Sequence, residues 1–379
     1  MLAALIASVK IALANVLLGA AMVCWLVAVG RGQARWRHAP LYLPLGAYVA
    51  ATLAAVAFSQ DPGHSAGEVA ELLTLAVVPM TVSLLDRTLW DRLLVGLTGV
   101  AVVSSALGVW QYLHGASSLE SRLRGITGHY MTFSGWTLVV TLLLVGDMVF
   151  NPHRRRMLWT LPACTLCSST LLLSFTRNAW VGLAAGLVLV ATVWKPKALF
   201  LYPLALALVA AALPRSVESR VVSIFDLGQP SSYDRLCMVM SGVEMVQDSP
   251  LFGVGMGMVG PSYRAYRVSD APRQRVPHLH NNLLQVAAER GLLGLASYLA
   301  ILVTFATYTW QALRRPRQPH FPALAGCFLA VAGVTVAGLF EYNWGDAEVW
   351  LVTLAALSAP FALAGDAPAA GHESPEGAG

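Results

Sequence analysis

Long apolar runs separated by short polar segments extend along almost the whole chain. A membrane-spanning helix needs about 20 largely apolar residues, and eleven runs approach that length. These runs cover approximately residues 2–30, 41–58, 68–85, 93–113, 131–149, 158–175, 179–194, 198–213, 283–310, 321–340 and 347–364. The pattern predicts an all-α polytopic membrane protein with about 11 to 12 transmembrane helices.

The composition favours the same class of protein. Hydrophobic residues make up 56% of the chain and charged residues only 12%, against about 25% charged residues in a typical soluble domain. So few charges cannot cover a water-facing surface, which excludes a cytosolic enzyme, a disulfide-rich secreted scaffold and a disordered protein. The net charge of +5 is better explained by basic cytoplasmic loops and an anionic ligand site than by nucleic-acid binding.

Basic residues are concentrated in alternate short loops. One set of loops holds Arg31, Arg35, Arg37, Arg87, Arg92, Arg154, Arg155, Arg156, Lys195, Lys197, Arg314, Arg315 and Arg317. The other short loops hold only Arg122, Arg124 and Arg177. By the positive-inside rule the first set is cytoplasmic and the second faces the periplasm.

This orientation divides the chain into four parts. They are N-terminal transmembrane helices (1–213), a large periplasmic loop (214–282), C-terminal transmembrane helices (283–364) and a disordered cytoplasmic tail (365–379). Eleven spans would also place the N-terminus outside. The sequence therefore leaves open a hairpin hidden within residues 2–30 or a further upstream helix.

The periplasmic loop contains one segment with helical periodicity. A helix is expected from Ser231 to Asp248, with apolar residues recurring at Leu236, Met240, Val243 and Val246. Such a short amphipathic helix should lie on the membrane surface or on the bundle with this apolar face inward. The glycines of residues 253–257 could form an anion nest, but a plain turn is the favoured interpretation.

Arginine is the sole basic residue type, histidine aside, in the large loop. The loop holds Arg215, Arg220, Arg235, Arg264, Arg267, Arg273 and Arg275 and no lysine. Arginine binds phosphate or carboxylate groups through two parallel hydrogen bonds, which favours an anion site over simple solubility. Arg177 connects two apolar runs with almost no loop. A charge at the membrane interface is expensive, so a functional role for Arg177 is favoured over an arginine that merely snorkels to the surface.

His280 stands where the large loop meets the ninth apolar run. An imidazole near several arginines suits general-base chemistry. His278 makes a His-x-His pair with it, but no third metal ligand of suitable spacing is evident, so no metal site is expected. A structural histidine capping the helix that starts near Asn281 is the alternative.

Four segments in this order resemble a known family. His280-Asn281, nine further residues and then Gly291-Leu292-Leu293-Gly294 resemble the His-Asn, x9, Gly-x-x-Gly signature of the O-antigen ligase and polymerase superfamily. The stretch 248–255 is similar to its Pro-Leu-x-Gly-x-Gly segment. Arg177 with Trp180, and Arg235 after Tyr233-Asp234, resemble its two essential arginines.

The resemblance implies a GT-C-type membrane glycosyltransferase, inverting and independent of metals and cofactors. The donor would be an undecaprenyl-diphosphate-linked glycan, and the acceptor a sugar hydroxyl of lipid A-core at the periplasmic face of the bacterial inner membrane. His280 is then the expected base, and Arg177 and Arg235 are expected to bind the diphosphate. Further expected substrate contacts are Arg122, Arg124, Asn281, Tyr233, Trp180 and His278.

Other functions stay open at this stage. Within the superfamily they are an O-antigen polymerase and a protein O-oligosaccharyltransferase. From another class, a solute transporter or lipid flippase predicts ionisable residues near the middle of the bilayer, where Lys10 is a rare example. Gly291 and Gly294 could allow close packing or could break their helix.

Overall fold

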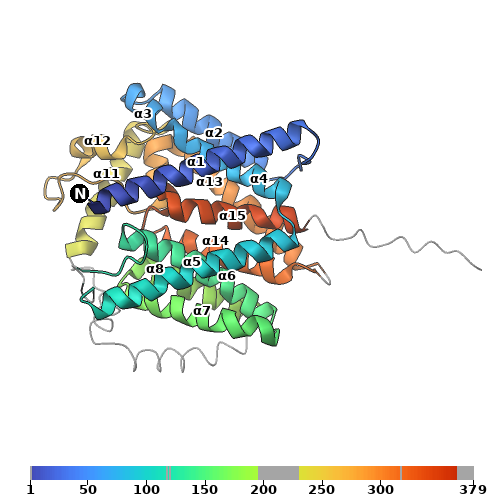
Figure 1. The fold of residues 1–379 in the computed structure, drawn as a ribbon. Helices are drawn as coiled ribbons and strands as arrows, with labels where there is room; N and C mark the ends of the chain where they lie inside the picture. Colours follow the sequence, from blue (N-terminus) through green and yellow to red (C-terminus); the bar gives the residue numbers. More distant parts are fainter. Residues whose placement is uncertain (1, 117, 119–120, 195–229, 316–317, 365–379) are drawn as a thin grey trace, which may run out of the picture.

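The computed structural model describes residues 2–116, 118, 121–194, 230–315 and 318–364, and these residues form a bundle of helices (Figure 1). The principal helices are α1 (Leu2–Gly30), α2 (Tyr42–Ala57), α3 (Pro62–Glu68), α4 (Val77–Leu84), α5 (Arg87–Leu113), α6 (Tyr130–Phe150), α7 (Arg154–Leu173), α8 (Arg177–Leu189), α11 (Pro230–Asp248), α12 (Val259–Tyr266), α13 (Asn282–Leu313), α14 (Phe321–Ala337) and α15 (Ala347–Leu363). Short 3-10 or π segments lie at Val69–Ala76, Val190–Trp194 and Asn343–Gly345. The expected all-α fold is confirmed.

Several helices have the length and composition of membrane spans. Five helical stretches meet both criteria, and they are Pro62–Leu84, Arg87–Leu113, Tyr130–Phe150, Arg177–Trp194 and Asn282–Leu313. Four shorter apolar helices accompany them, namely Val16–Gly30, Tyr42–Ala57, Phe321–Ala337 and Ala347–Leu363. The chain is therefore a polytopic membrane protein. The expected span 198–213, the first part of the large loop (214–229) and the tail lie outside the described residues.

The first helix differs from one of the sequence-based alternatives. α1 runs without interruption from Leu2 to Gly30. A hairpin hidden in this run is therefore wrong. The 29 residues of α1 contain no proline that would break the helix, and the two glycines, Gly19 and Gly30, both lie in its C-terminal half.

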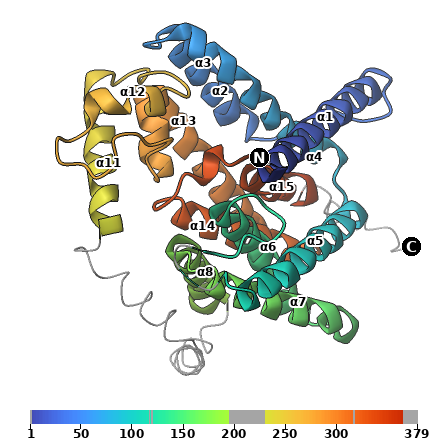
Figure 2. The ribbon, with the colours of Figure 1, turned by 60° about the vertical axis from the view of Figure 1, so that its left-hand side comes forward.

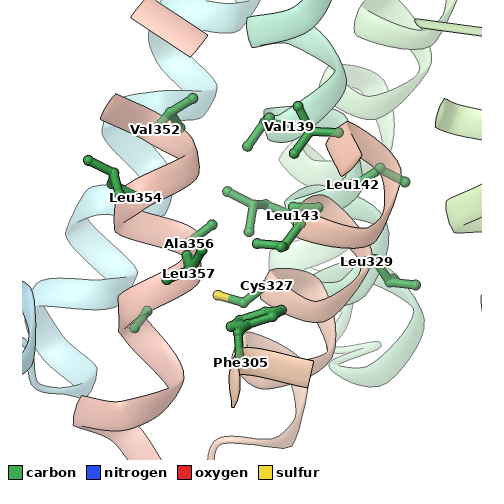
Figure 3. Close-up of a cluster of buried hydrophobic side chains, with 14 of the residues drawn as sticks. Val139, Leu142, Leu143, Phe305, Cys327, Leu329, Val352, Leu354, Ala356 and Leu357 are labelled. Carbon is green, nitrogen blue, oxygen red and sulfur yellow. The ribbon is translucent and has the colours of Figure 1, made fainter. Parts of the chain in front are cut away.

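α6 lies at the centre of the bundle, where it packs against α14, α8 and α15. In its most apolar window 78% of the residues are buried inside the protein. Figure 3 shows Val139 and Leu143 of α6 beside α15, with Val139 level with Val352 and Leu143 nearer to Ala356. This core holds α8, which carries Arg177, in a fixed place beside α14.

The loops separate into two groups at opposite ends of the bundle. At one end Arg156 bridges Asp91 at 2.8 Å and Asp147 at 2.6 Å, and Arg87 donates to the carbonyl of Pro319 at 3.2 Å. These contacts bring together the loops that the sequence predicts as cytoplasmic. We call this the basic end.

At the other end, contacts join the loops predicted to be periplasmic. The backbone N–H of Gln60 donates to the carbonyl of Val254 at 3.0 Å, and the Asn281 side chain donates to the carbonyl of Leu339 at 2.9 Å. The expected alternation of the loops thus agrees with their contacts. Figure 2 shows α11 and α12 beside α13, with α5 and α7 on another side of the bundle.

α13 is interrupted where it meets the glycine-rich stretch of the large loop. Gly291 has φ 65° and ψ −172°, a conformation essentially restricted to glycine, and a Cβ there would collide with the backbone of Leu251. Val254 N donates to Ala288 O, and Leu292 N donates to Pro250 O, both at 2.8 Å. We call residues 250–257 and 288–292 the glycine interlock.

The interlock decides two sequence-based alternatives. Gly291 both breaks its helix and permits close packing, so the two interpretations hold together. Gly253 likewise has positive φ, and a Cβ there would meet the backbone of Ala288 to Arg290. The glycine-rich stretch is therefore a turn that docks on α13, as the favoured interpretation had it.

α11 matches its expected bounds, but of its expected apolar face only Val246 packs against the protein, so of the two alternatives, packing of this face on the bundle is wrong. Leu236, Met240 and Val243 are 54%, 51% and 43% exposed. The face packed inward instead contains Cys237, Met238, Ser241 and Met245. Both faces carry apolar residues, so periodicity alone could not choose between them. The exposed face remains available to lipid, in line with the membrane-surface alternative.

Candidate active site

A cavity of about 420 Å³ opens at the end opposite the basic loops. Four segments line it: the loop between α5 and α6, here called the outer loop, with the start of α6, the turn into α8, the first turns of α11, and the segment before α13. Its lining includes Arg122, His129, Tyr130, Arg177, Arg235, Arg273, His278 and His280. The imidazole and the two guanidinium groups expected to act together thus share one cavity, although Arg177 and His280 are far apart in sequence.

The local backbone at two of these segments is unusual. Phe175, two residues before Arg177, has φ 54°, and His280 has φ 52°. Among the described residues these are the two non-glycine residues with positive φ, and both line the cavity. Such conformations cost on the order of 1–3 kcal/mol and cluster at functional sites. The strained turns let both segments direct side chains into the cavity.

His280 is held by a carboxylate. Its Nδ1 lies 2.9 Å from both carboxylate oxygens of Glu341. A carboxylate accepts a hydrogen bond from Nδ1–H, so the neutral ring carries its proton on Nδ1 and leaves Nε2 as the proton acceptor. Asn281, the next residue, caps α13 by accepting from the Leu284 amide at 2.9 Å. The capping role expected for His280 as the alternative therefore belongs to Asn281.

Glu341 is buried, with 4% of its surface exposed. Burial acts to raise its pKa, but the hydrogen bond from His280, the charge of His280 and the nearby Arg235 outweigh burial and hold the pKa below the usual range. Arg235 Nη2 lies 4.0 Å from Glu341 Oε2. The group therefore stays a carboxylate at neutral pH and carries the charge that orients His280.

Sequence reasoning missed Glu341. It lies 61 residues after His280, so no short spacing joins the two. The available signal was an acidic residue at the predicted outer end of an apolar run, because a charge at that depth indicates function by default.

His278 packs against His280. The ring centroids of His278 and His280 are 4.3 Å apart, in an edge-to-face arrangement. Burial lowers the pKa of His278 to about 4, despite the opposing effect of Glu341. His278 is therefore neutral at physiological pH and offers the cavity an uncharged hydrogen-bonding ring.

His278, His280 and Glu341 also form the kind of cluster that can hold a metal, since one ligand atom from each lies within 4.8 Å of the others. Glu341 is the third ligand that sequence spacing did not reveal. The cluster nevertheless faces Arg235 and the other guanidinium groups of the cavity, whose positive charge opposes a cation. The chemistry of these residues fits an anion better than a metal ion.

A second hollow, which we call the apolar groove, adjoins the cavity. Its volume is about 290 Å³. Its apolar lining consists of Val181, Leu236, Val239, Leu279, Leu339 and Phe340. Arg177, Arg235 and His280 line both the cavity and the groove, so the charged groups stand at the junction of a polar and an apolar space.

Part of the chain is similar in sequence to known proteins. The O-antigen ligase family model matches residues 162–299. A Rickettsia conorii protein with the provisional name polysaccharide ligase is 22% identical over 241 residues. That alignment covers 59% of this chain and 55% of the relative, so it spans about half of the relative's length. These matches support the expected resemblance to the O-antigen ligase superfamily.

The part matched by the O-antigen ligase model contains Arg177, Arg235, His280 and the whole glycine interlock. Four lining residues lie outside that part, namely Arg122, His129, Tyr130 and Met131. Glu341, which hydrogen-bonds His280, also lies outside it. The matched range therefore includes the three expected groups, whereas Glu341 and the cavity wall before α7 lie outside it.

Other residues expected to contact substrate occupy varied places. Arg122 and His278 line the cavity, and Asn281 lines the groove. Trp180 instead packs on Phe175 and donates its indole N–H to Leu171 O at 2.7 Å. Tyr233 hydrogen-bonds Asp270. Arg124 is exposed. The described residues that line the cavity and the groove do not include Arg124, Trp180 or Tyr233.

Proposed function

We propose that this chain is an O-antigen ligase that transfers a glycan from undecaprenyl diphosphate to a sugar hydroxyl of lipid A-core. One observation carries the proposal: Arg177, Arg235 and His280 stand together where the polar cavity meets the apolar groove. A lipid-linked diphosphate sugar carries matching groups in the same order: an apolar chain for the groove, two phosphates for the arginines and a polar glycan for the cavity.

The donor is expected to lie across that junction. Its isoprenoid chain would occupy the apolar groove, where Leu236 and Phe340 are exposed by 54% and 45%. The guanidinium groups of Arg177 and Arg235 would bind the diphosphate through charge-assisted hydrogen bonds. The glycan would then extend into the cavity, with the anomeric carbon near His280.

The transfer step needs a base and a stabilised leaving group. Nε2 of His280 takes the proton of the acceptor hydroxyl as its oxygen bonds to the anomeric carbon from the face opposite the diphosphate. The bond from the anomeric carbon to the diphosphate oxygen breaks, and its electron pair leaves with that oxygen. Arg177 and Arg235 stabilise the developing negative charge, so no strong general acid is required. The configuration at the anomeric carbon is inverted.

Glu341 acts through His280. Its carboxylate keeps the proton on Nδ1, orients the ring and stabilises the imidazolium that forms during transfer. Glu341 is therefore a positioning residue.

The expected location follows from the basic end of the bundle. Arg87 and Arg156, which the positive-inside rule assigns to the cytoplasm, lie at the end opposite the cavity. The active site would then face the periplasm from the inner membrane, as a GT-C-type enzyme that works on a lipid-linked donor requires.

A reconstituted transfer assay tests the proposal. Purified protein in lipid vesicles is incubated with an undecaprenyl-diphosphate glycan, lipid A-core and a metal chelator, and product size is read on a gel. We expect one glycan joined to lipid A-core, with no loss caused by the chelator. His280→Ala should reduce transfer by about 10²- to 10⁴-fold, while donor binding is retained.

His114→Ala is the matched control. His114 lies at the C-terminal end of α5, where its Nδ1 pairs with Trp110 O at 2.8 Å, and its loss should leave transfer unchanged. Full activity of His280→Ala would refute the assigned base. Growth of the glycan on the donor without attachment to lipid A-core would identify a polymerase instead.

A further inference from the structure

A further histidine lines the cavity at the end of the outer loop. His129 comes directly before α6 and lines the cavity but not the apolar groove, whereas Arg177 and His280 line both. Its imidazole ring lies beside the ring of Tyr130, with the two ring centroids 4.4 Å apart. His129 therefore belongs to a part of the cavity wall that the groove does not share.

Hydrogen bonds hold the backbone of His129 before any ligand arrives. Its carbonyl oxygen accepts from Thr127 Oγ1 at 2.9 Å and from Phe133 N at 3.0 Å. In the first turn of α6, the Thr132 hydroxyl donates to a carboxylate oxygen of Asp346 at 2.6 Å, which ties this turn to the start of α15. The ring is thus presented from a fixed point, which lowers the entropic cost of binding a ligand.

The cap of α6 decides which ring nitrogen of His129 carries the proton. Nδ1 accepts a hydrogen bond from the backbone N–H of Met131 at 3.3 Å. A ring nitrogen that accepts has no proton, so the neutral ring carries its proton on Nε2. Partial burial lowers the pKa of His129, and the charges of Glu341 and Asp346 do not offset this effect. The ring is therefore neutral at physiological pH.

His129 and His280 offer opposite chemistry to the same cavity. Glu341 holds the proton of His280 on Nδ1 and leaves Nε2 as an acceptor, whereas His129 offers an Nε2–H donor. Within the part of the chain that the structure describes, this Nε2–H has no hydrogen-bond partner. A neutral N–H suits an uncharged sugar oxygen, because charged donors such as arginine form the stronger bonds to anions.

We propose that Nε2–H of His129 donates a hydrogen bond to a sugar oxygen of the substrate and thereby selects and orients a glycan in the cavity. This inference rests on the proposed function, since it assigns a substrate contact in the same site. The sugar belongs to the donor glycan or to lipid A-core, because both meet at the anomeric carbon near His280. His129 is not a second base, because its Nε2 already carries a proton.

Direct binding to three lipids tests the inference. The full-length protein in detergent is titrated with undecaprenyl-diphosphate glycan, with undecaprenyl diphosphate that carries no sugar, and with lipid A-core. In His129→Ser we expect roughly 3- to 10-fold weaker binding of a sugar-bearing lipid, the effect of losing one neutral hydrogen bond. Binding of the lipid without sugar should stay unchanged. Weaker donor binding assigns the contact to the donor glycan, and weaker lipid A-core binding assigns it to the acceptor.

The variants separate the ring from its role as a helix cap. Serine caps helices well, so His129→Ser should keep a melting temperature close to that of the wild type. His129→Ala removes ring and cap together, and it should lower the melting temperature while weakening sugar binding no more than His129→Ser does.

His153→Ser is the matched control. His153 is the residue before α7 at the basic end, and its side chain makes no cap hydrogen bond. Its replacement should leave the affinities for all three lipids unchanged.

Three results would overturn the inference. They are unchanged binding of both sugar-bearing lipids by His129→Ser, an equal loss of affinity for the lipid without sugar, or the same loss from His153→Ser. If the wild-type protein transfers no glycan, the proposed function fails, but the titrations still decide this inference because they need no turnover. Normal transfer with unchanged sugar binding in His129→Ser would remove this contact and leave the proposed function in place.

Discussion

The cavity and the glycine interlock both contain residues of the segments that resemble the O-antigen ligase signature, but they use opposite chemistry. In the cavity, long polar side chains from four segments meet around a space of about 420 Å³. In the interlock, Gly253 and Gly291 leave no side chain at all, and two backbones meet through hydrogen bonds of 2.8 Å. One region depends on functional groups, and the other depends on their absence.

This difference predicts how the two regions respond to substitution. A changed cavity residue removes a charge or a base while the backbone keeps its place. A changed interlock residue separates α13 from the turn at residues 250–257, and the N-terminus of α13 follows directly after His280. The interlock therefore supports the site without touching substrate.

The largest expected effect contrasts these regions directly. Gly291→Ala places a Cβ against the backbone of Leu251 and forces alanine into a conformation reserved for glycine. The backbone strain costs about 1–3 kcal/mol and the overpacking about 1–3 kcal/mol more. We expect lower yield, a lower melting temperature in detergent and loss of transfer, whereas His280→Ala should lose transfer at an unchanged melting temperature.

Gly99→Ala supplies the control for this comparison. Gly99 lies inside α5, and a Cβ there meets nothing within 4 Å. Its stability should stay the same or rise slightly, because alanine favours helix. A Gly291→Ala protein that melts like wild type would end the distinction between the two regions.

The next effect concerns the carboxylate behind the base. Glu341→Gln removes the negative charge that stabilises the imidazolium, so kcat should fall by about 10²-fold while the donor KM changes little. The acid limb of the pH–rate profile should move to lower pH, because protonation of His280 loses its counter-charge. A purely structural role would lower activity without moving that limb, so an unmoved limb would contradict the assignment.

Sequence supplied the three central groups of the cavity, because a polytopic pattern and the segments around Arg177, Arg235 and His280 are visible along the chain. It could not supply Glu341, whose relation to His280 exists only after α13 and α14 have packed. It could not show which apolar face of α11 packs on the bundle either, since Leu236 and Met238 are both apolar and only packing against α13 decides which is covered.

A smaller effect is expected from the arginines. Arg177→Lys and Arg235→Lys each retain a positive charge but lose the planar fork, which should reduce kcat/KM by about 10-fold, or about 1.4 kcal/mol. The reduction should appear with the diphosphate donor in steady-state transfer assays. Near-normal turnover in both variants would show that these residues are ordinary surface cations. The claim that the cavity depends on its functional groups would then fail for the two arginines.

The smallest effect is expected at His278, which lines the same cavity without acting as the base. Its pKa of about 4 means that the ring is already neutral at pH 5.5 and gains no proton between pH 8 and 5.5. His278→Asn should therefore leave the acid limb of the pH–rate profile in place, and kcat/KM should fall by less than about 10-fold for one neutral hydrogen bond. A shift of the limb by a full pH unit would instead make His278 the titrating group and would move the base from His280 to its neighbour.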